Sequence, residues 1–393
     1  MILLPTSPDA NHLISANGAP SGPRLRILCL FGTRPETIKF APVIHALEKA
    51  GHESVNVTSA QHRDLLYPLV KLFNLRLDHD LGVMKPGQSL NHVLSRVVEA
   101  LDPLLVSLAP DAILVQGDTT TALAGALAGW NRRIPVGHIE AGLRSGDAHS
   151  PYPEEMNRRV ISQMATWHFA ATERNRRTLL DEGVSAAAVH VTGNPVIDAL
   201  HWTLKNLEPS PEAGKLLGEL AGERFILLTT HRRESFGQVM RSNLEVLRDF
   251  IHAHRNVSLV FPVHPNPEVK AVATSVFQNS PRVRLIDPLP YQDFLHLASR
   301  AHLLVSDSGG VQEEAPSLRR PLIVLRENTE RPEAVDCGAA RLIGNDPEAL
   351  RASLENAWLS DSWHQQLSTL SNPYGDGRSA ERIASILAVP LAV

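Results

Sequence analysis

The stretch LRILCLFGTRPETIK (residues 25–39) joins an aliphatic run to a helix-length segment through a glycine turn. The aliphatic run has the length and composition of a buried β-strand. Gly32 permits the tight turn, and Pro35 suits the first turn of a helix. Because Arg34 and Lys39 lie near the start of this helix, the corner can bind an anion such as a phosphate. A plain helix start with surface bases fits the same residues, and the segment alone leaves both interpretations open.

The same unit recurs along the chain, since short aliphatic runs alternate with amphipathic stretches of helix length. Alternation of this kind predicts an α/β fold with parallel sheets that carry helices on both faces. The predicted strands are Arg26–Leu30, Glu53–Thr58, Ala112–Val115, Ile134–Ile139, His168–Ala171, Phe225–Thr229, Ser258–Val263, Val283–Ile286, Leu303–Ser306 and Leu322–Leu325.

The chain is long enough for two domains. Its 393 residues, 43% of them hydrophobic, suit two cores of roughly 150 to 200 residues each. The alternation is interrupted between Asn194 and Gly222, so we place the boundary there. The predicted parts are a disordered tail (1–24), two Rossmann-like domains (25–192 and 193–372), and a C-terminal helix (373–393) that packs back on the first domain. Two doubly wound domains would face each other across a central cleft, where such sheets bind ligands.

The composition excludes several classes of protein. A net charge of −4 gives no general attraction to nucleic acid or to an anionic membrane, and no apolar run reaches 18 residues. The two cysteines fit a reducing cytosol, and Cys29 lies in a predicted strand, where it is expected to pack. No H-E-x-x-H pattern or Cys/His ligand spacing occurs, so we expect no metal.

Acidic and basic side chains follow the predicted strands of the first half. Asp118 and Glu140 each come at the end of a strand, and Glu154 with Arg158 lies on a helix entered through Pro151-Tyr152-Pro153. Asp118 precedes three threonines and could merely cap the next helix. Convergence of three acids on one cleft favours a catalytic site.

In the second half, a glycine-rich turn follows a strand as SDSGGVQEEAP (residues 306–316). Its glycines allow a diphosphate to approach the backbone, while a carboxylate can bind ribose hydroxyls. Neither G-x-G-x-x-G nor the P-loop pattern follows the first strand, so nicotinamide chemistry and triphosphate hydrolysis lose their main support. His231 and His264 both follow aliphatic runs at the cleft end of the second domain.

Taken together, the chain resembles the non-hydrolysing UDP-N-acetylglucosamine 2-epimerases. The similarity extends from about Arg26 to the C-terminus. Its blocks, in the family order, are FGTRPETIK, AQHRDLL, VQGDTTTALAGALA, GHIEAGLRSGD, SPYPEEMNRR, VTGNPVIDAL, TTHRRESFG, PVHPNP, SDSGGVQEEAP and RENTERPEA.

The resemblance implies a fold of the glycosyltransferase-B type and a reaction that interconverts UDP-GlcNAc and UDP-ManNAc. UDP would be eliminated across C1–C2 to give 2-acetamidoglucal and then returned, with no cofactor. The resemblance further implies a homodimer, a cytoplasmic location and a role in supplying polysaccharide synthesis.

The resemblance also assigns roles to residues of this chain. The implied catalytic residues are Asp118, Glu140, Glu154 and His231, the last assisting UDP departure. The implied substrate-binding residues are Arg34, Lys39, Arg158, His264, Phe294, Ser308, Gly309, Gly310, Glu314 and Arg331. Which acid serves which face of the sugar stays open, because removal and delivery of the proton need groups on opposite sides.

Three other functions remain open at this point. A related epimerase could act on a UDP-2,3-diacetamido-uronic acid, since pocket shape decides between the sugars. A glycosyltransferase of the same architecture would need an acceptor pocket, and a non-catalytic sensor of nucleotide sugars would not need the acids.

Overall fold

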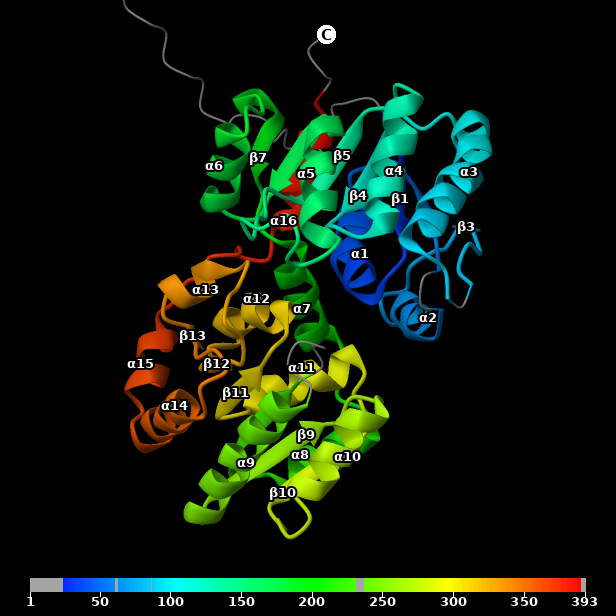
Figure 1. The fold of residues 1–393 in the computed structure, drawn as a ribbon. Helices are drawn as coiled ribbons and strands as arrows, with labels where there is room; N and C mark the ends of the chain where they lie inside the picture. Colours follow the sequence, from blue (N-terminus) through cyan, green and yellow to red (C-terminus); the bar gives the residue numbers. More distant parts are fainter. Residues whose placement is uncertain (1–23, 61–62, 86, 231–236, 390–393) are drawn as a thin grey trace, which may run out of the picture.

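The computed structural model describes residues 24–389 except 61–62, 86 and 231–236. Two sheets with helices on both faces lie one above the other (Figure 1). The upper sheet has the strand order β3-β2-β1-β4-β5-β6-β7 and the lower sheet β10-β9-β8-β11-β12-β13. All neighbouring strands are parallel, which confirms the predicted fold class.

The strands of the upper sheet are β1 Arg26–Phe31, β2 Glu53–Thr58, β3 His79–Asp80, β4 Ala112–Gln116, β5 Val136–Ala141, β6 Trp167–Ala170 and β7 Val189–Val191. Those of the lower sheet are β8 Arg224–Thr229, β9 Val257–Pro262, β10 Val283–Ile286, β11 Leu303–Ser306, β12 Leu322–Val324 and β13 Ala340–Leu342. All ten predicted strands are present with small shifts of their ends. β3, β7 and β13 were not predicted, because each has only two or three residues and includes polar ones, whereas the three-residue β12 is wholly aliphatic.

Helices cover both faces of each sheet. In the first half they are α1 Arg34–Lys49, α2 Arg63–Leu72, α3 Leu90–Leu108, α4 Thr120–Asn131, α5 Glu154–Met164 and α6 Glu173–Asp181, followed by a short 3₁₀ turn, Ala186–Ala188. The helices that follow are α7 Pro195–Asn206, α8 Pro211–Glu219, α9 Gln238–Ala253, α10 Pro267–Val276, α11 Tyr291–Arg300, α12 Gly309–Leu318, α13 Pro332–Asp336, α14 Pro347–Leu359, α15 Ser362–Ser368 and α16 Ser379–Leu387.

The first helix begins as the sequence predicts. Thr33 is the N-cap of α1, and Glu36 completes a capping box while Pro35 occupies the first turn. The aliphatic side chains of β1 are buried on both of its faces, and Cys29 is among them. A central parallel strand must be apolar on both faces, which explains why this run is continuous and not alternating.

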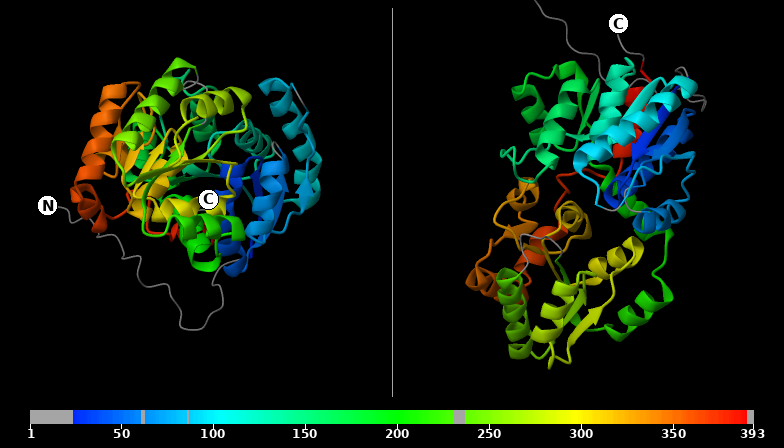
Figure 2. Two further views of the ribbon diagram at one scale, coloured as in Figure 1. Left: turned by 90° about the horizontal axis from the view of Figure 1, so that it is seen from below. Right: turned by 45° about the vertical axis from the view of Figure 1, so that its right-hand side comes forward.

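One of the apolar clusters extends across both halves, while others belong to one half alone. A single cluster of buried apolar side chains includes Phe31 of β1, Ile197 of α7 and Leu227 of β8. The C-terminal helix α16 returns to the upper half and packs against α1 and α7 (Figure 2). The limits of the domains, including the predicted tail, stay a prediction. Among the described helices, none has the length and apolarity to cross a membrane.

Candidate active site

Glu140 lies inside β5 in a backbone conformation that few residues with a side chain adopt. Its φ is +66°, and the pairing of β5 with β6 skips it, since Ile139 pairs with Phe169 and Ala141 with Ala170. Glu140 thus lies at the end of its strand as predicted, as the penultimate residue of β5, but the sequence did not show that it forms a β-bulge there. A bulge re-aims the extra residue, and here it directs the carboxylate toward the other half of the molecule.

Basic and amide groups surround the Glu140 carboxylate. Oε1 lies 2.6 Å from Lys39 Nζ and accepts a hydrogen bond of 3.3 Å from Asn194 Nδ2, while Gln116 donates to Oε2. Burial alone would raise the pKa of Glu140, but Lys39 and Arg331 outweigh it and hold that pKa below the ordinary range. Glu140 is therefore ionised at neutral pH, as a base must be.

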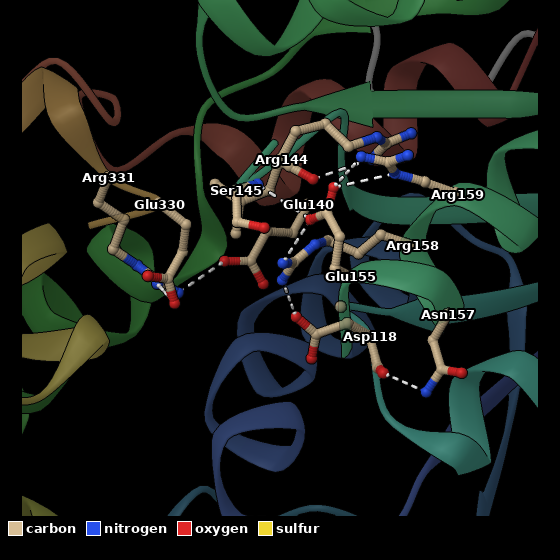
Figure 3. Close-up of polar contacts among 12 residues, drawn as sticks. Asp118, Glu140, Arg144, Ser145, Glu155, Asn157, Arg158, Arg159, Glu330 and Arg331 are labelled. Carbon is tan, nitrogen blue, oxygen red and sulfur yellow. Dashed lines mark hydrogen bonds and ion pairs between the residues drawn. The ribbon is translucent and has the colours of Figure 1, made fainter. Parts of the chain in front are cut away.

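Asp118 follows β4 through Gly117, which has a φ of +68°. Arg158 Nη1 lies 2.5 Å from Asp118 Oδ2, and Asn157 donates to the Asp118 carbonyl over 2.8 Å (Figure 3). Thr119, and not Asp118, caps α4, because its hydroxyl accepts from the Ala122 N–H. The alternative of a simple helix cap is thus excluded. Burial raises the pKa of Asp118, and Arg158 opposes this effect.

Glu154 is the first residue of α5 and is half-buried. Arg158, which binds Asp118, is one turn further along the same helix, and residues four apart lie on the same face. Its neighbour Glu155 is fully buried and is engaged by Arg158 and Arg159 (Figure 3). Glu154 therefore lies on the same face of α5 as Arg158, the residue that binds Asp118. Glu155 instead stabilises the helix through its ion pairs with Arg158 and Arg159.

Two residues that the sequence analysis missed hold the loop around Asp118. The buried Glu36 accepts from the N–H groups of Gly32 and Thr33 and from the hydroxyl of Thr119. On the other side, His138 Nε2 lies 2.7 Å from the Gly117 carbonyl. Burial lowers the pKa of His138 to about 3, so the neutral ring donates this bond. Glu36 stands in the FGTRPETIK block, but nothing in its spacing shows that it reaches the loop after β4.

In the second half, Ser308 caps α12 and the helix opens with Gly309 and Gly310. A Cβ on Gly309 would lie 2.6 Å from Arg331 Nη1, so the glycine makes room for this guanidinium. A Cβ on Gly310 would have Ser308 Oγ as its nearest neighbour, at 4.0 Å. The start of α12 therefore offers backbone N–H groups beside a guanidinium, an arrangement that suits a phosphate.

Charged groups from the two halves meet between the sheets. Arg331 Nε lies 2.6 Å from Glu313 Oε1. Arg331 Nη2 lies 3.7 Å from Glu140 Oε1, and Figure 3 shows these two side chains facing each other. Lys39 Nζ lies 3.3 Å from Glu313 Oε2 as well as next to Glu140. We call Lys39, Glu140, Glu313 and Arg331 the interdomain cluster. It brings predicted site residues of both halves together.

The sequence analysis named Glu314 and missed Glu313. Glu314 is buried and accepts a 2.9 Å hydrogen bond from Tyr291 Oη, and burial raises its pKa to about 7. The charge of Glu314 also acts on Arg34, whose pKa is lowered mainly by burial. Successive helical residues point about 100° apart, so the pair Glu-Glu in the sequence does not reveal which carboxylate faces Lys39.

The remaining predicted site residues do not belong to the interdomain cluster. Phe294 of α11 is half-buried and packs against the core, and His264 is exposed in the loop after β9. His231 lies outside the described residues. No group of three or more potential metal ligands occurs among the residues that the structure describes. A cavity of about 670 Å³ near the chain crossing at Gly193 and Gly375 contains none of the predicted site residues.

Comparison with known proteins decides the family. The family model described as UDP-N-acetylglucosamine 2-epimerase matches residues 45–388. The chain belongs to the UDP-N-acetylglucosamine 2-epimerase family. It is 45% identical to the UDP-N-acetylglucosamine 2-epimerase of Salmonella typhimurium over 369 residues, which cover 92% of this chain and 98% of the relative.

Solved structures agree with this family assignment. The UDP-GlcNAc 2-epimerase from Neisseria meningitidis bound to UDP-GlcNAc is 39% identical, with a TM-score of 0.87 over 92% of this chain and 99% of that chain. The glycosyltransferase of kitacinnamycin, at 14% identity and a TM-score of 0.64, covers 94% of this chain and 100% of its own. That second likeness shows the glycosyltransferase-B type of fold alone. The 2-epimerase family predicted from the sequence blocks is thereby confirmed.

Proposed function

We propose that this protein catalyses the reversible C2 epimerisation of UDP-N-acetylglucosamine to UDP-N-acetylmannosamine. The observation that carries the proposal is the interdomain cluster, in which Glu140 of the upper half meets Arg331 and Glu313 of the lower half. A carboxylate and a guanidinium from opposite sides of one site suit a reaction that removes a proton from a sugar and stabilises a departing diphosphate. Activities named for relatives with 42–46% identity over most of the chain support the same substrate.

The proposed reaction has two stages. A carboxylate removes the C2 proton while the C1–O bond breaks, its electron pair leaves with UDP, and a C1–C2 double bond forms in 2-acetamidoglucal. UDP then adds again to C1 as a proton reaches C2 from the opposite face. The roles of base and acid fall to Asp118, Glu140 and Glu154, with His231 assisting UDP departure.

The substrate-binding roles that we propose follow from the same reaction and from the family resemblance. Lys39 and Arg331 would neutralise the diphosphate, together with the backbone at Ser308, Gly309 and Gly310. Arg34 and Arg158 would line the sugar and diphosphate region, Glu314 would bind the ribose hydroxyls, and Phe294 would lie near the uracil. His264 would be a further substrate-binding residue. No cofactor takes part in these steps.

Proton exchange tests the proposal directly. Incubation of the enzyme with UDP-GlcNAc in deuterated water is expected to place one deuterium at C2 of the UDP-ManNAc formed, measured by NMR and mass spectrometry. Product without deuterium at C2 would contradict the elimination and point to oxidation and re-reduction.

Two further properties belong to the proposal. The protein would act in the cytoplasm, in keeping with two cysteines that are both free in the structure.

The protein would also form a homodimer, as the family resemblance implies. Sedimentation equilibrium is expected to give twice the 43.0 kDa mass of one chain, and a single-chain mass at micromolar concentration would refute the dimer.

A further inference from the structure

Glu313 is a buried carboxylate of the lower half that reaches a cation of the upper half. It lies on α12, and its side chain is 2% exposed. Oε1 accepts from Arg331 Nε over 2.6 Å, whereas Oε2 lies 3.3 Å from Lys39 Nζ on α1. Oε2 has no well-directed hydrogen bond from the described residues, so the Lys39 charge is what stabilises it.

Glu313 shares both of its cations with Glu140. Lys39 Nζ lies 2.6 Å from Glu140 Oε1, and Arg331 Nη2 lies 3.7 Å from the same oxygen. Two cations and two carboxylates, one carboxylate from each half of the molecule, therefore lie together, and the two carboxylates also interact with each other directly. Without Glu313, Lys39 would be left with Glu140 as its carboxylate partner in the cluster, and Arg331 would keep only Glu330 and the more distant Glu140, so both side chains would lose the partner that fixes their separation.

We propose that Glu313 is a positioning residue that holds Lys39 and Arg331 at the spacing needed to stabilise the departing diphosphate. This inference rests on the proposed epimerase function. When the C1–O bond breaks, its electron pair stays on the diphosphate oxygen, so negative charge grows there in the transition state. Cations held in place before the reaction stabilise that state more than the bound substrate, so their misplacement lowers kcat more than it raises KM.

Glu313 and its neighbour Glu314 have different partners. Glu314 accepts from Tyr291 and lies near Arg34, and it does not belong to the interdomain cluster. The two adjacent carboxylates on α12 thus contribute to different parts of the site.

Substitution of Glu313 by glutamine tests the role. Glu313→Gln keeps the shape and one acceptor for Arg331 but removes the charge opposite Lys39. We expect kcat to fall by at least about tenfold while KM for UDP-GlcNAc changes by less than about threefold. A purely structural role would lower the temperature of unfolding without this division between kcat and KM.

Asp336→Asn is the matched control. Asp336 pairs with Arg174 across the same boundary over 2.6 Å, but both side chains are more than half exposed. This variant is expected to keep the wild-type kcat, because an exposed pair contributes little. A kcat of folded Glu313→Gln within about twofold of wild type, or an equal loss in Asp336→Asn, would overturn the inference.

A second variant covers the case in which Glu313→Gln does not fold. Glu313→Asp keeps the charge and withdraws it by one carbon, so a lower kcat at unchanged KM is expected, and wild-type kinetics would overturn the role. Failure of the wild-type enzyme to form UDP-ManNAc would instead refute the proposed function itself. Normal wild-type turnover together with unaffected Glu313 variants would refute this inference alone.

Discussion

Glu140 combines a strained backbone with a stabilised charge. A residue with a side chain in the left-handed region costs roughly 1–2 kcal/mol relative to a regular conformation. Its ion pair with Lys39 and the hydrogen bonds from Gln116 and Asn194 hold the side chain in this orientation. The strain therefore coincides with one of the three carboxylates among which we propose the base and the acid, as expected where function and local stability compete.

Neutral replacements of the three proposed catalytic acids test their chemistry. Asp118→Asn, Glu140→Gln and Glu154→Gln are each expected to lower turnover of UDP-GlcNAc by at least about 10²-fold, the range of general acid–base groups. The control Asp102→Asn removes an exposed pair with Arg132 and is expected to retain full activity. Rates near the wild type in all three acid variants would exclude the carboxylate mechanism, whereas the absence of turnover in the wild-type protein itself would favour a non-catalytic sensor.

The buried Glu314 predicts a pH dependence of stability. Burial raises the pKa of Glu314 to about 7, above its value in the unfolded chain, so the folded state keeps a proton that the unfolded state releases. This contribution is fully present below the unfolded pKa and is lost as pH rises through the folded pKa. Relative to wild type, Glu314→Gln should therefore gain free energy of unfolding between about pH 4.5 and 7.

Urea unfolding of the ligand-free proteins at several pH values measures this difference. Glutamine retains an acceptor for the Tyr291 hydroxyl, so the loss of the titrating group is the main change. A constant difference in free energy across this pH range would show that Glu314 does not titrate as described.

At the scale of one element, the start of α12 combines a helix terminus with an arginine from a distant loop. Gly309 accommodates the Arg331 guanidinium, which Glu313 and Glu330 hold over 2.6 and 3.0 Å. Gly310 has open space at the position of a Cβ. Two adjacent glycines therefore differ in their surroundings: Gly309 makes room for a side chain, whereas a Cβ at Gly310 would meet no atom closer than 4.0 Å.

Alanine substitutions at the two glycines should reveal this difference. Gly310→Ala is expected to raise the free energy of unfolding of the ligand-free protein by up to about 1 kcal/mol, because alanine favours the helix. Gly309→Ala should show no such gain, since its Cβ displaces Arg331, and kcat should fall. Thermal unfolding and steady-state kinetics measure both effects. Equal stability changes in the two variants would contradict the packing described.

At the scale of the whole molecule, the chain crosses between the halves twice, and Tyr374 links the crossings. Its carbonyl accepts from the Asn194 N–H over 2.7 Å. Its buried hydroxyl donates to the Arg331 carbonyl over 3.0 Å and accepts from the Ala334 N–H over 3.2 Å. Because Tyr374 bonds to both Asn194 and Arg331, a movement of one half relative to the other is expected to shift Arg331. A narrow site would exclude water from the glycal intermediate.

Removal of the Tyr374 hydroxyl should loosen this link. Tyr374→Phe leaves the Arg331 carbonyl and the Ala334 N–H with only the 3.3 Å hydrogen bond between them, and it is expected to lower the free energy of unfolding by about 1 kcal/mol. It should also increase the release of free UDP and 2-acetamidoglucal during turnover, measured by chromatography. The control Tyr67→Phe removes an exposed hydroxyl bound to Asp80 and should change stability by less than about 0.5 kcal/mol. Equal leakage from both variants would refute the role of Tyr374.

Much of the fold follows from local sequence patterns. Short runs rich in aliphatic residues predicted ten of the strands, and the alternation of strands with helices predicted two doubly wound sheets. Positions of Asp118 after β4 and of the glycine pair after β11 were also predictable, because the ends of parallel strands mark the ligand-binding edge of such sheets. The sequence blocks shared with the 2-epimerase family predicted the epimerisation reaction.

Other features depended on contacts between residues far apart in the chain. The bulge at Glu140 arises from pairing with β6, and the cap of α4 proved to be Thr119. The selection of Glu313 as the partner of Lys39 depends on how the two sheets face each other. A linear pattern records periodicity and turn chemistry, which are local properties. The direction of a side chain within a turn, and the charge that it meets across the two halves, are set only when the sheets pack.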